Sequence, residues 1–203
     1  MAAEGGEVRA RTATPSDLAA VTETIALAFH EDPTWSWAFP DSSRRQEQYT
    51  ILWQFLVAGA LRYPWVLVTE DCEAAAVWIP PGGTELTEED EAEVVPLVER
   101  LVGPRAPDVL ELVARFEAAH PRDEPHYYLS LLATHPTHAG KGIGMRLLAE
   151  SLERIDEDGR PAYLESTNPG NNRRYERHGF EAIGEFFPPG GETPVTTMWR
   201  SAR

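Results

Sequence analysis

The sequence has few of the features that mark secreted or membrane proteins. Cys72 is the only cysteine among 203 residues, which excludes a disulfide framework and predicts a reduced, cytoplasmic setting. No run approaches the roughly eighteen consecutive apolar residues of a transmembrane helix. Residues 1–17 are small and polar, without the apolar core of a secretory signal. We therefore expect no membrane partner.

Basic residues are also scarce. The chain has 18 Lys and Arg against 33 Asp and Glu, a formal net charge of −15, and Lys141 is its only lysine. Nucleic acid is excluded as a partner, because binding it depends on neutralising phosphates with Lys and Arg. An acidic surface suits a cationic small substrate, although solubility alone also explains it.

Apolar periodicity and turn residues predict one α/β domain over residues 1–203, a usual length for a single domain. Strands are expected at 7–14, 65–70, 74–80, 126–134, 161–167, 180–187 and 194–200, and helices at 14–30, 43–62, 87–101, 106–120, 143–157 and 171–178. The segment 31–41 is expected to break the first of these helices through Pro33 and Pro40. Thr87 is expected to cap its helix, and Pro96 to bend or divide it.

The stretch HAGKGIGMRLL (138–148) places three glycines between a strand and a helix. The first amides of a helix have no intrahelical partner and bind anions, and glycine lets a phosphate approach them. A P-loop requires Ser or Thr after its lysine, whereas Lys141 precedes Gly142. A dinucleotide-binding loop requires a third glycine where Met145 stands. Neither of these phosphate loops fits.

The same loop resembles motif A of the GNAT acetyltransferase superfamily, a Q/R-x-x-G-x-G/A sequence after the fourth strand. Gly142 and Gly144 match its two small positions, and Ala139 departs from it at the Q/R position. The resemblance implies that backbone amides do most of the pyrophosphate binding, so the departure weakens the motif without cancelling it.

A second block, residues 162–180, resembles the fifth strand and following short helix of the same family. Tyr175, Gly179 and Phe180 match its Y-x-x-x-G-F ending. Residues 162–180, the length of the chain and the helical segment before the fourth strand also resemble puromycin N-acetyltransferase-like members. Together with the order of the elements, the two motifs cover nearly the whole chain.

The resemblance implies a GNAT fold. Its mixed central sheet has about six to seven strands, splayed between the fourth and fifth, flanked by helices and with a helical insertion before the fourth strand. Residues 7–125 would form mainly the acceptor side and the insertion, and residues 126–203 the acetyl-CoA-binding core. The implied chemistry is direct attack of an amine on the thioester of acetyl-CoA, with no metal.

Acetyl-CoA would lie in the splay and along the glycine loop. The resemblance implies contacts from the end of the fourth strand, from the loop and from the residues that open the last helix: Leu132, Ala133, Thr134, Ala139, Gly140, Lys141, Gly142, Ile143, Gly144, Met145, Asn168, Asn171 and Arg174. The two asparagines fit equally well as helix caps. His135 and His138 lie three residues apart, but a third metal ligand is missing from their loop.

The resemblance assigns Tyr175 as the acid that protonates the departing thiolate, although packing in the core would also account for it. Many relatives carry a catalytic glutamate on the fourth strand, where Tyr128 stands here, and a phenol with an ordinary pKa near 10 is no base at neutral pH. Glu165 is the best replacement as base, acting through water, followed by His126 and His120.

The acceptor would be the amine of a small molecule, such as an antibiotic or an amine metabolite. Glu31 and Asp32 could meet its charge, and an aromatic wall could be formed by Trp35, Trp37 and Phe39, unless they only pack the core. An insertion at 80–125 could cover the cleft and favour a small acceptor.

Two other functions are alternatives to acetylation of a small amine. They are a non-catalytic acyl-CoA-binding module and a protein or peptide N-acetyltransferase. We expect a monomer or a homodimer.

Overall fold

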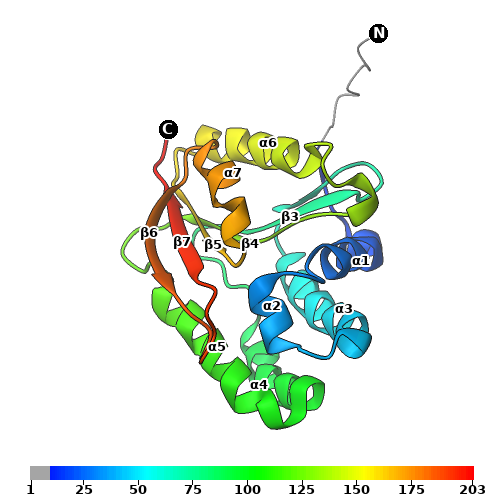
Figure 1. Ribbon diagram of the computed structural model, residues 1–203. Coiled ribbons are helices and arrows are strands. Elements are labelled where there is room, and N and C mark those ends of the chain that lie inside the picture. The colour runs from blue at the N-terminus through cyan, green and yellow to red at the C-terminus, as the bar shows by residue number, and fades with distance from the viewer. Residues whose placement is uncertain (1–9) are drawn as a thin grey trace.

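The computed structural model describes residues 10–203 (Figure 1). A seven-stranded sheet crosses the molecule in the order β1-β2-β3-β4-β5-β7-β6. Its strands are β1 Arg11–Thr12, β2 Val66–Val68, β3 Ala74–Ile79, β4 Tyr127–Thr134, β5 Ala162–Ser166, β6 Glu181–Phe186 and β7 Val195–Arg200. Only β4 and β5 pair in parallel in the described sheet. The predicted mixed α/β fold is confirmed; residues 7–9 of the predicted first strand lie outside the described residues.

Helices cover both faces of the sheet (Figure 1). They are α1 Leu18–Ala28, α2 Pro33–Ala38, α3 Ser42–Ala60, α4 Glu88–Val102, α5 Ala106–Ala119, α6 Ile143–Glu157 and α7 Asn172–Glu176. One core cluster joins α1, α3, α4 and α5 to one face, and a second joins α6 to the other. Each fully buried Leu, Ile, Val or Phe contributes about 1.5–3 kcal/mol.

The segment from 31 to 41 is more regular than predicted, because it contains the short helix α2. The side chain of Asp32 caps this helix by accepting hydrogen bonds from the backbone amides of Thr34 (3.0 Å) and Trp35 (3.1 Å). Pro33 occupies the first helical position, where its missing N–H costs nothing and its fixed φ suits the helix. The first helix does end before Pro33, at Ala28, as predicted, whereas α2 itself was not predicted.

The insertion before β4 consists of α4 and α5, as predicted. Thr87 and Asp90 form a reciprocal capping box at the start of α4. Helix α4 continues through Pro96, so the prediction that this proline could divide it was wrong. Pro96 lies on the exposed side, while the next two residues, Leu97 and Val98, pack into the core and hold the helix together. Within residues 10–203, every helix is too short or too polar to cross a bilayer.

Candidate active site

Strands β4 and β5 diverge after three residue pairs. Tyr127–Leu129 pair with Ala162–Leu164, and beyond them the described part of β5 pairs only with β7. Ser130 is skipped in the register with β3 as well, because Leu129 pairs with Trp78 and Leu131 with Val77. Ser130 is thus a bulge at the point where the strands separate. The splay between β4 and β5 is confirmed.

Beyond this bulge, the edge of β4 that faces β5 is open. Leu132, Ala133 and Thr134, predicted to contact acetyl-CoA, lie in this part of the strand and line a cavity. Backbone groups on an unpaired strand edge can pair with an extended ligand as with an added strand. The structure thus offers the backbone surface that the sequence prediction required.

The glycine loop connects β4 to α6. Gly140 has φ of 77° and Gly142 has φ of 73°, a left-handed conformation that glycine adopts without strain. Gly142 caps α6, and no side chain of the described residues bonds to the first amides of the helix as a cap. Those amides are available to an anion.

Gly144 lies directly against β4. A Cβ atom built at Gly144 would come within 2.3 Å of the Thr134 hydroxyl oxygen, so a side chain here would displace the loop or the strand. The guanidinium of Arg146 donates to the carbonyl of Lys141 (3.0 Å) and folds over the loop. Lys141 itself is exposed, outside the residues that line the cavity, whereas Ala139 is part of the lining.

A cavity of about 1380 Å³ runs from the glycine loop through the splay to the insertion. It is lined by the loop, the open parts of β4 and β5, and residues of α1, α2, α3, α4 and α5. Among the described residues, seven carboxylates line it against two arginines: Glu31, Asp32, Glu85, Glu91, Glu117, Glu124 and Glu165, with Arg122 and Arg174. This excess of negative charge favours a cationic guest.

Tyr175 lies in α7 and lines the cavity. Its ring packs at a steep angle on Phe180, with 6.2 Å between ring centroids. Burial, and to a lesser degree the charge of Asp32, raises the pKa of the Tyr175 phenol to about 12, while Arg174 opposes the shift. The phenol is therefore protonated at neutral pH and able to donate a proton.

The residues between β5 and α7 are tied by local hydrogen bonds. The side-chain oxygen of Asn168 accepts from the Gly170 amide (3.0 Å), and that of Asn171 accepts from the Arg174 guanidinium (3.0 Å). All three predicted cofactor contacts of this segment, Asn168, Asn171 and Arg174, line the cavity with Tyr175. The two asparagines thus stabilise the connection between β5 and α7 through these hydrogen bonds.

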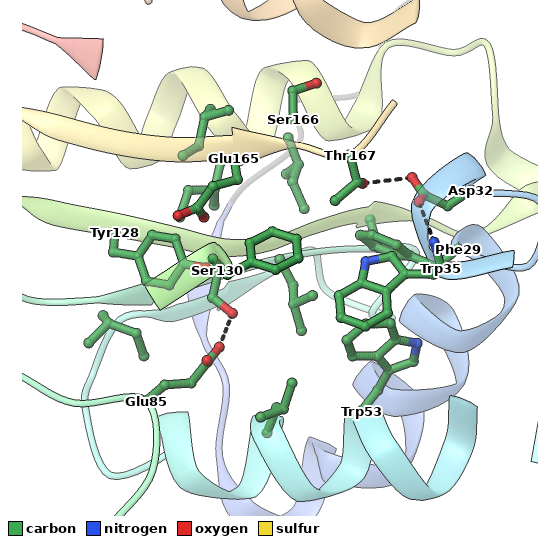
Figure 2. A pocket seen from close by; sticks show the side chains of 18 of the residues that line it. Phe29, Asp32, Trp35, Trp53, Glu85, Tyr128, Ser130, Glu165, Ser166 and Thr167 are labelled. Carbon is green, nitrogen blue, oxygen red and sulfur yellow. Dashed lines mark hydrogen bonds between the residues drawn. The ribbon is translucent and has the colours of Figure 1, made fainter. Parts of the chain in front are cut away.

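Asp32 joins α2 to the end of β5. Its second carboxylate oxygen accepts a 2.7 Å hydrogen bond from the Thr167 hydroxyl (Figure 2). Burial raises the pKa of this carboxyl, and the three hydrogen bonds to it oppose that shift. In contrast, the Glu31 carboxylate is 83% exposed and lies 2.7 Å from the His30 ring nitrogen. The buried carboxylate of this pair is Asp32, which the sequence did not distinguish from Glu31.

Glu165, the predicted base, follows the last residue of β5 that pairs with β4. Its side chain is 3% exposed, and one carboxylate oxygen lies 3.8 Å from Nδ1 of His120. Figure 2 shows Glu165 and Tyr128 on the same side of the pocket as Ser130 and Glu85. Burial, with the charges of Glu165 and Glu85, raises the pKa of Tyr128 still further, which agrees with its exclusion as a base.

Glu85 is a site residue that sequence reasoning missed. It lies in the connection between β3 and α4 and accepts a hydrogen bond from the Ser130 hydroxyl at the bulge (Figure 2). Burial, and then the neighbouring charge of Glu165, raises the pKa of Glu85 to about 7. No periodic pattern or motif marks this glutamate in the sequence, so no local signal could have found it.

Two of the three residues of the predicted aromatic wall, Trp35 and Phe39, line the cavity. Trp35 lines the cavity, with its ring edge-on to Trp53 (4.8 Å between centroids) and stacked on Phe116 (6.0 Å, 10° between planes). Trp37 instead packs under the guanidinium of Arg105, 4.9 Å from its ring centroid, and is not among the cavity residues. Phe116 belongs to α5, so the insertion does cover the acceptor side of the cavity.

No group of three or more His, Cys, Asp or Glu side chains is arranged to hold a metal ion within the described part of the chain. The rings of His135 and His138 lie 6.2 Å apart in the loop after β4, and His135 instead bonds the Thr137 hydroxyl (2.8 Å).

Comparison with known proteins places this geometry in a family. The chain is 36% identical over 72 residues to acetyltransferase Atu2258 of Agrobacterium fabrum, a match that covers 35% of this chain and 53% of that protein. The chain thus spans about half the length of the curated relative it matches.

Solved structures resemble nearly the whole chain at low sequence identity. A histone acetyltransferase HPA2 and related acetyltransferase from Corynebacterium glutamicum has a TM-score of 0.70 at 22% identity, covering 97% of both chains. A polyamine N-acetyltransferase of Drosophila melanogaster, which forms N-acetylagmatine, has a TM-score of 0.66 at 18% identity, covering 96% of this chain and all of that one. These likenesses establish the fold.

The model of the acetyltransferase (GNAT) family matches residues 26–180, which contain the glycine loop, the splayed strands and Tyr175. Because this match spans most of the chain and agrees with the sheet topology, the chain belongs to the acetyltransferase (GNAT) family.

Proposed function

We propose that the protein transfers an acetyl group from acetyl-CoA to the amine of a small cationic molecule by direct attack. The continuous cavity carries this proposal, because it joins the free amides of the glycine loop to an acid-lined chamber through the splay. One end suits a pyrophosphate and the other a positively charged amine, with the diverging strands between them.

On the donor side, the pantetheine would pair with the open edge of β4 at Leu132, Ala133 and Thr134. The amides from Ala139 to Met145 would hold the pyrophosphate, with Lys141 as a point charge at the phosphate end. Asn168, Asn171 and Arg174 would contact the cofactor from the segment before Tyr175.

For the chemistry, Glu165 would accept the proton that the ammonium group of the acceptor loses, acting through water. The neutral amine would attack the thioester carbon, and Tyr175 would donate its proton to the departing thiolate. Its raised pKa keeps this phenol protonated until the thiolate forms.

On the acceptor side, the seven carboxylates and the ring of Trp35 suit a compact cation. Polyamine acetylation by the Drosophila relative supports this class, since polyamines are cationic. The cover formed by α4 and α5 favours a small molecule over a protein tail.

Four further predictions from the sequence stay predictions. They are the single-domain division, the puromycin N-acetyltransferase-like subtype, the cytoplasmic location, and the monomeric or homodimeric state.

Thiol release from acetyl-CoA with a panel of amines tests the proposal. We expect turnover with cationic primary amines, and acetylated amine as the product by mass spectrometry. Tight binding of CoA without turnover on any amine would favour the non-catalytic module, for which Ala139 at the Q/R position is the motivating departure. Turnover confined to peptide acceptors would favour a protein N-acetyltransferase.

Replacing Glu165 by Gln should lower kcat and shift the acidic limb of the pH dependence of kcat/KM. An amide accepts no proton at neutral pH, so the proton of the amine would have to pass to another group. Glu85→Gln is the comparison, because Glu85 lines the same cavity and its pKa is raised to about 7. If Glu165→Gln leaves the acidic limb unshifted and Glu85→Gln shifts it, Glu165 is not the base.

Replacing Lys141 by Gln should raise KM for acetyl-CoA by at most about fivefold, as expected for an exposed ion pair, with kcat unchanged. The difference from wild type should shrink as salt is added, because exposed charges are screened. KM measured at low and high ionic strength checks this. A lower kcat would show that Lys141 does more than assist binding.

A further inference from the structure

Two histidines adjoin Glu165 at the closed end of the splay. Nδ1 of His126 lies 2.7 Å from the backbone carbonyl oxygen of Glu124, and Nε2 of His126 lies 3.1 Å from Nε2 of His120. The other nitrogen of His120, Nδ1, lies 3.8 Å from a carboxylate oxygen of Glu165. The two histidines thus connect a backbone carbonyl to the carboxylate in the cavity, through two hydrogen bonds and one longer contact.

The backbone carbonyl of Glu124 determines which nitrogens of the two histidines carry protons. The Glu124 carbonyl only accepts, so Nδ1 of His126 must carry a hydrogen. Burial lowers the pKa of His126, which keeps the ring neutral and leaves Nε2 as an acceptor. Nε2 of His120 must then be the donor between the two rings, and in neutral His120 the lone pair is on Nδ1, facing Glu165.

We propose that Glu165 and His120 together form the base, the proton that they take up closing the 3.8 Å gap between Oε1 and Nδ1 to a hydrogen bond, and that His126 is a positioning residue that sets the tautomer of His120. The inference deepens the proposed function and rests on it for its catalytic part. A lone pair and a carboxylate that face each other repel until a proton lies between them, and the proton removed from the acceptor amine fills that place.

Aromatic rings and carboxylates surround His120. Its ring lies edge-on to those of Tyr128 (4.8 Å between centroids) and Tyr163 (5.0 Å). The carboxylates of Glu85 and Glu117 line the same cavity as His120 and add negative charge around it. The ring of His126 is buried and lies edge-on to that of Trp199 (5.1 Å between centroids).

The proton balance is simple. The ammonium group of the acceptor loses one proton to the Glu165–His120 pair, and its nitrogen then forms the C–N bond while the C–S bond breaks. The thiolate takes a proton from Tyr175. The tetrahedral nitrogen loses its second proton, which restores the Tyr175 phenol, and the pair releases its proton to solvent before the next turnover.

Nitrogen-15 NMR of protein labelled at histidine tests the tautomers without any need for turnover. At pH values where both rings are neutral, we expect His126 protonated on Nδ1 and His120 on Nε2, with the signals assigned from the His120→Gln and His126→Gln variants. Neutral His120 protonated on Nδ1 would overturn the proposal. If the protein has the expected tautomers but acetylates no amine, the proposed function is wrong and the arrangement of the histidines stands.

Kinetics of two substitutions test the role of His126. In His126→Gln the side-chain carbonyl can still accept from Nε2 of His120, whereas His126→Phe offers no acceptor. We expect His126→Phe to lower kcat about 10- to 100-fold, as loss of an orienting partner does elsewhere, and to shift the acidic limb at unchanged KM for acetyl-CoA. His126→Gln should restore most of the rate.

The control is His178→Gln, which alters a histidine outside the cavity residues and should leave kinetics unchanged. Equal losses in His126→Phe and His126→Gln would overturn the positioning role. If His126→Phe does not fold, the tautomers in the wild-type protein still decide the proposal.

Discussion

Replacing Tyr175 by Phe is expected to lower kcat by about 10²- to 10⁴-fold, the usual contribution of a positioned proton donor. The substitution removes one hydroxyl and keeps the ring that packs on Phe180, so KM for acetyl-CoA should change little. Because the pKa of Tyr175 is raised to about 12, the phenol is protonated at every pH in the neutral range. The loss should therefore be constant with pH.

The matched control is Tyr127→Phe. Its hydroxyl donates to Asp158 (3.0 Å), and Tyr127 is not among the cavity residues. This variant should lose some stability and keep its turnover number. Steady-state rates for both variants settle the role of Tyr175: unchanged turnover in Tyr175→Phe would show that the residue only packs the core.

Replacing Gly144 by Val is expected to weaken acetyl-CoA binding by about 10- to 100-fold, equivalent to losing one or two hydrogen bonds to a charged group. A Cβ at this position would lie 2.3 Å from the Thr134 hydroxyl oxygen, so the loop must move away from β4. The amides that face the pyrophosphate would move with it. Titration of CoA by calorimetry measures the effect.

Ala149→Val provides the control, because it introduces the same branched side chain into the same helix, α6, about one and a half turns nearer its middle and away from the loop. It should leave the dissociation constant of CoA unchanged, and thermal unfolding of both variants separates a binding defect from a folding defect. If a folded Gly144→Val protein binds CoA as tightly as wild type, the loop does not hold the pyrophosphate.

The sequence predicted those parts of the site that short segments encode. The glycines at 140, 142 and 144 indicate a flexible turn and a helix start that an anion can approach, and the structure has a left-handed Gly140 and Gly142 before the start of α6, which no described side chain caps. The short helix with Tyr175 was likewise predicted from one contiguous block. Local conformation depends mainly on neighbouring residues, so such segments can be interpreted without the fold.

The parts that the sequence did not predict depend on distant contacts. Asp32 bonds to Thr167, 135 residues away, and Glu85 bonds to Ser130 across 45 residues. Asp32 faces Thr167, whereas the adjacent Glu31 is exposed to solvent. Which carboxylate is buried is decided by the packing of α2 against the end of β5.

A local signal for α2 was present and was misinterpreted. Asp32 followed by Pro33 is a favourable start for a helix, with an oxygen to cap the first amides and a proline at the first position. Treating Pro33 only as a helix breaker ignored this. The outcome matters for the site, because α2 presents Trp35 to the cavity and turns Trp37 towards Arg105.

A crystal structure of the protein with acetyl-CoA bound tests the central claim most directly. We predict the pyrophosphate on the amides of residues 139–145, the pantetheine along the open edge of β4, and the thioester sulfur within hydrogen-bond distance of the Tyr175 hydroxyl, with Glu165 facing the space beyond. A pyrophosphate bound away from the glycine loop, or a sulfur out of reach of Tyr175, would contradict the account.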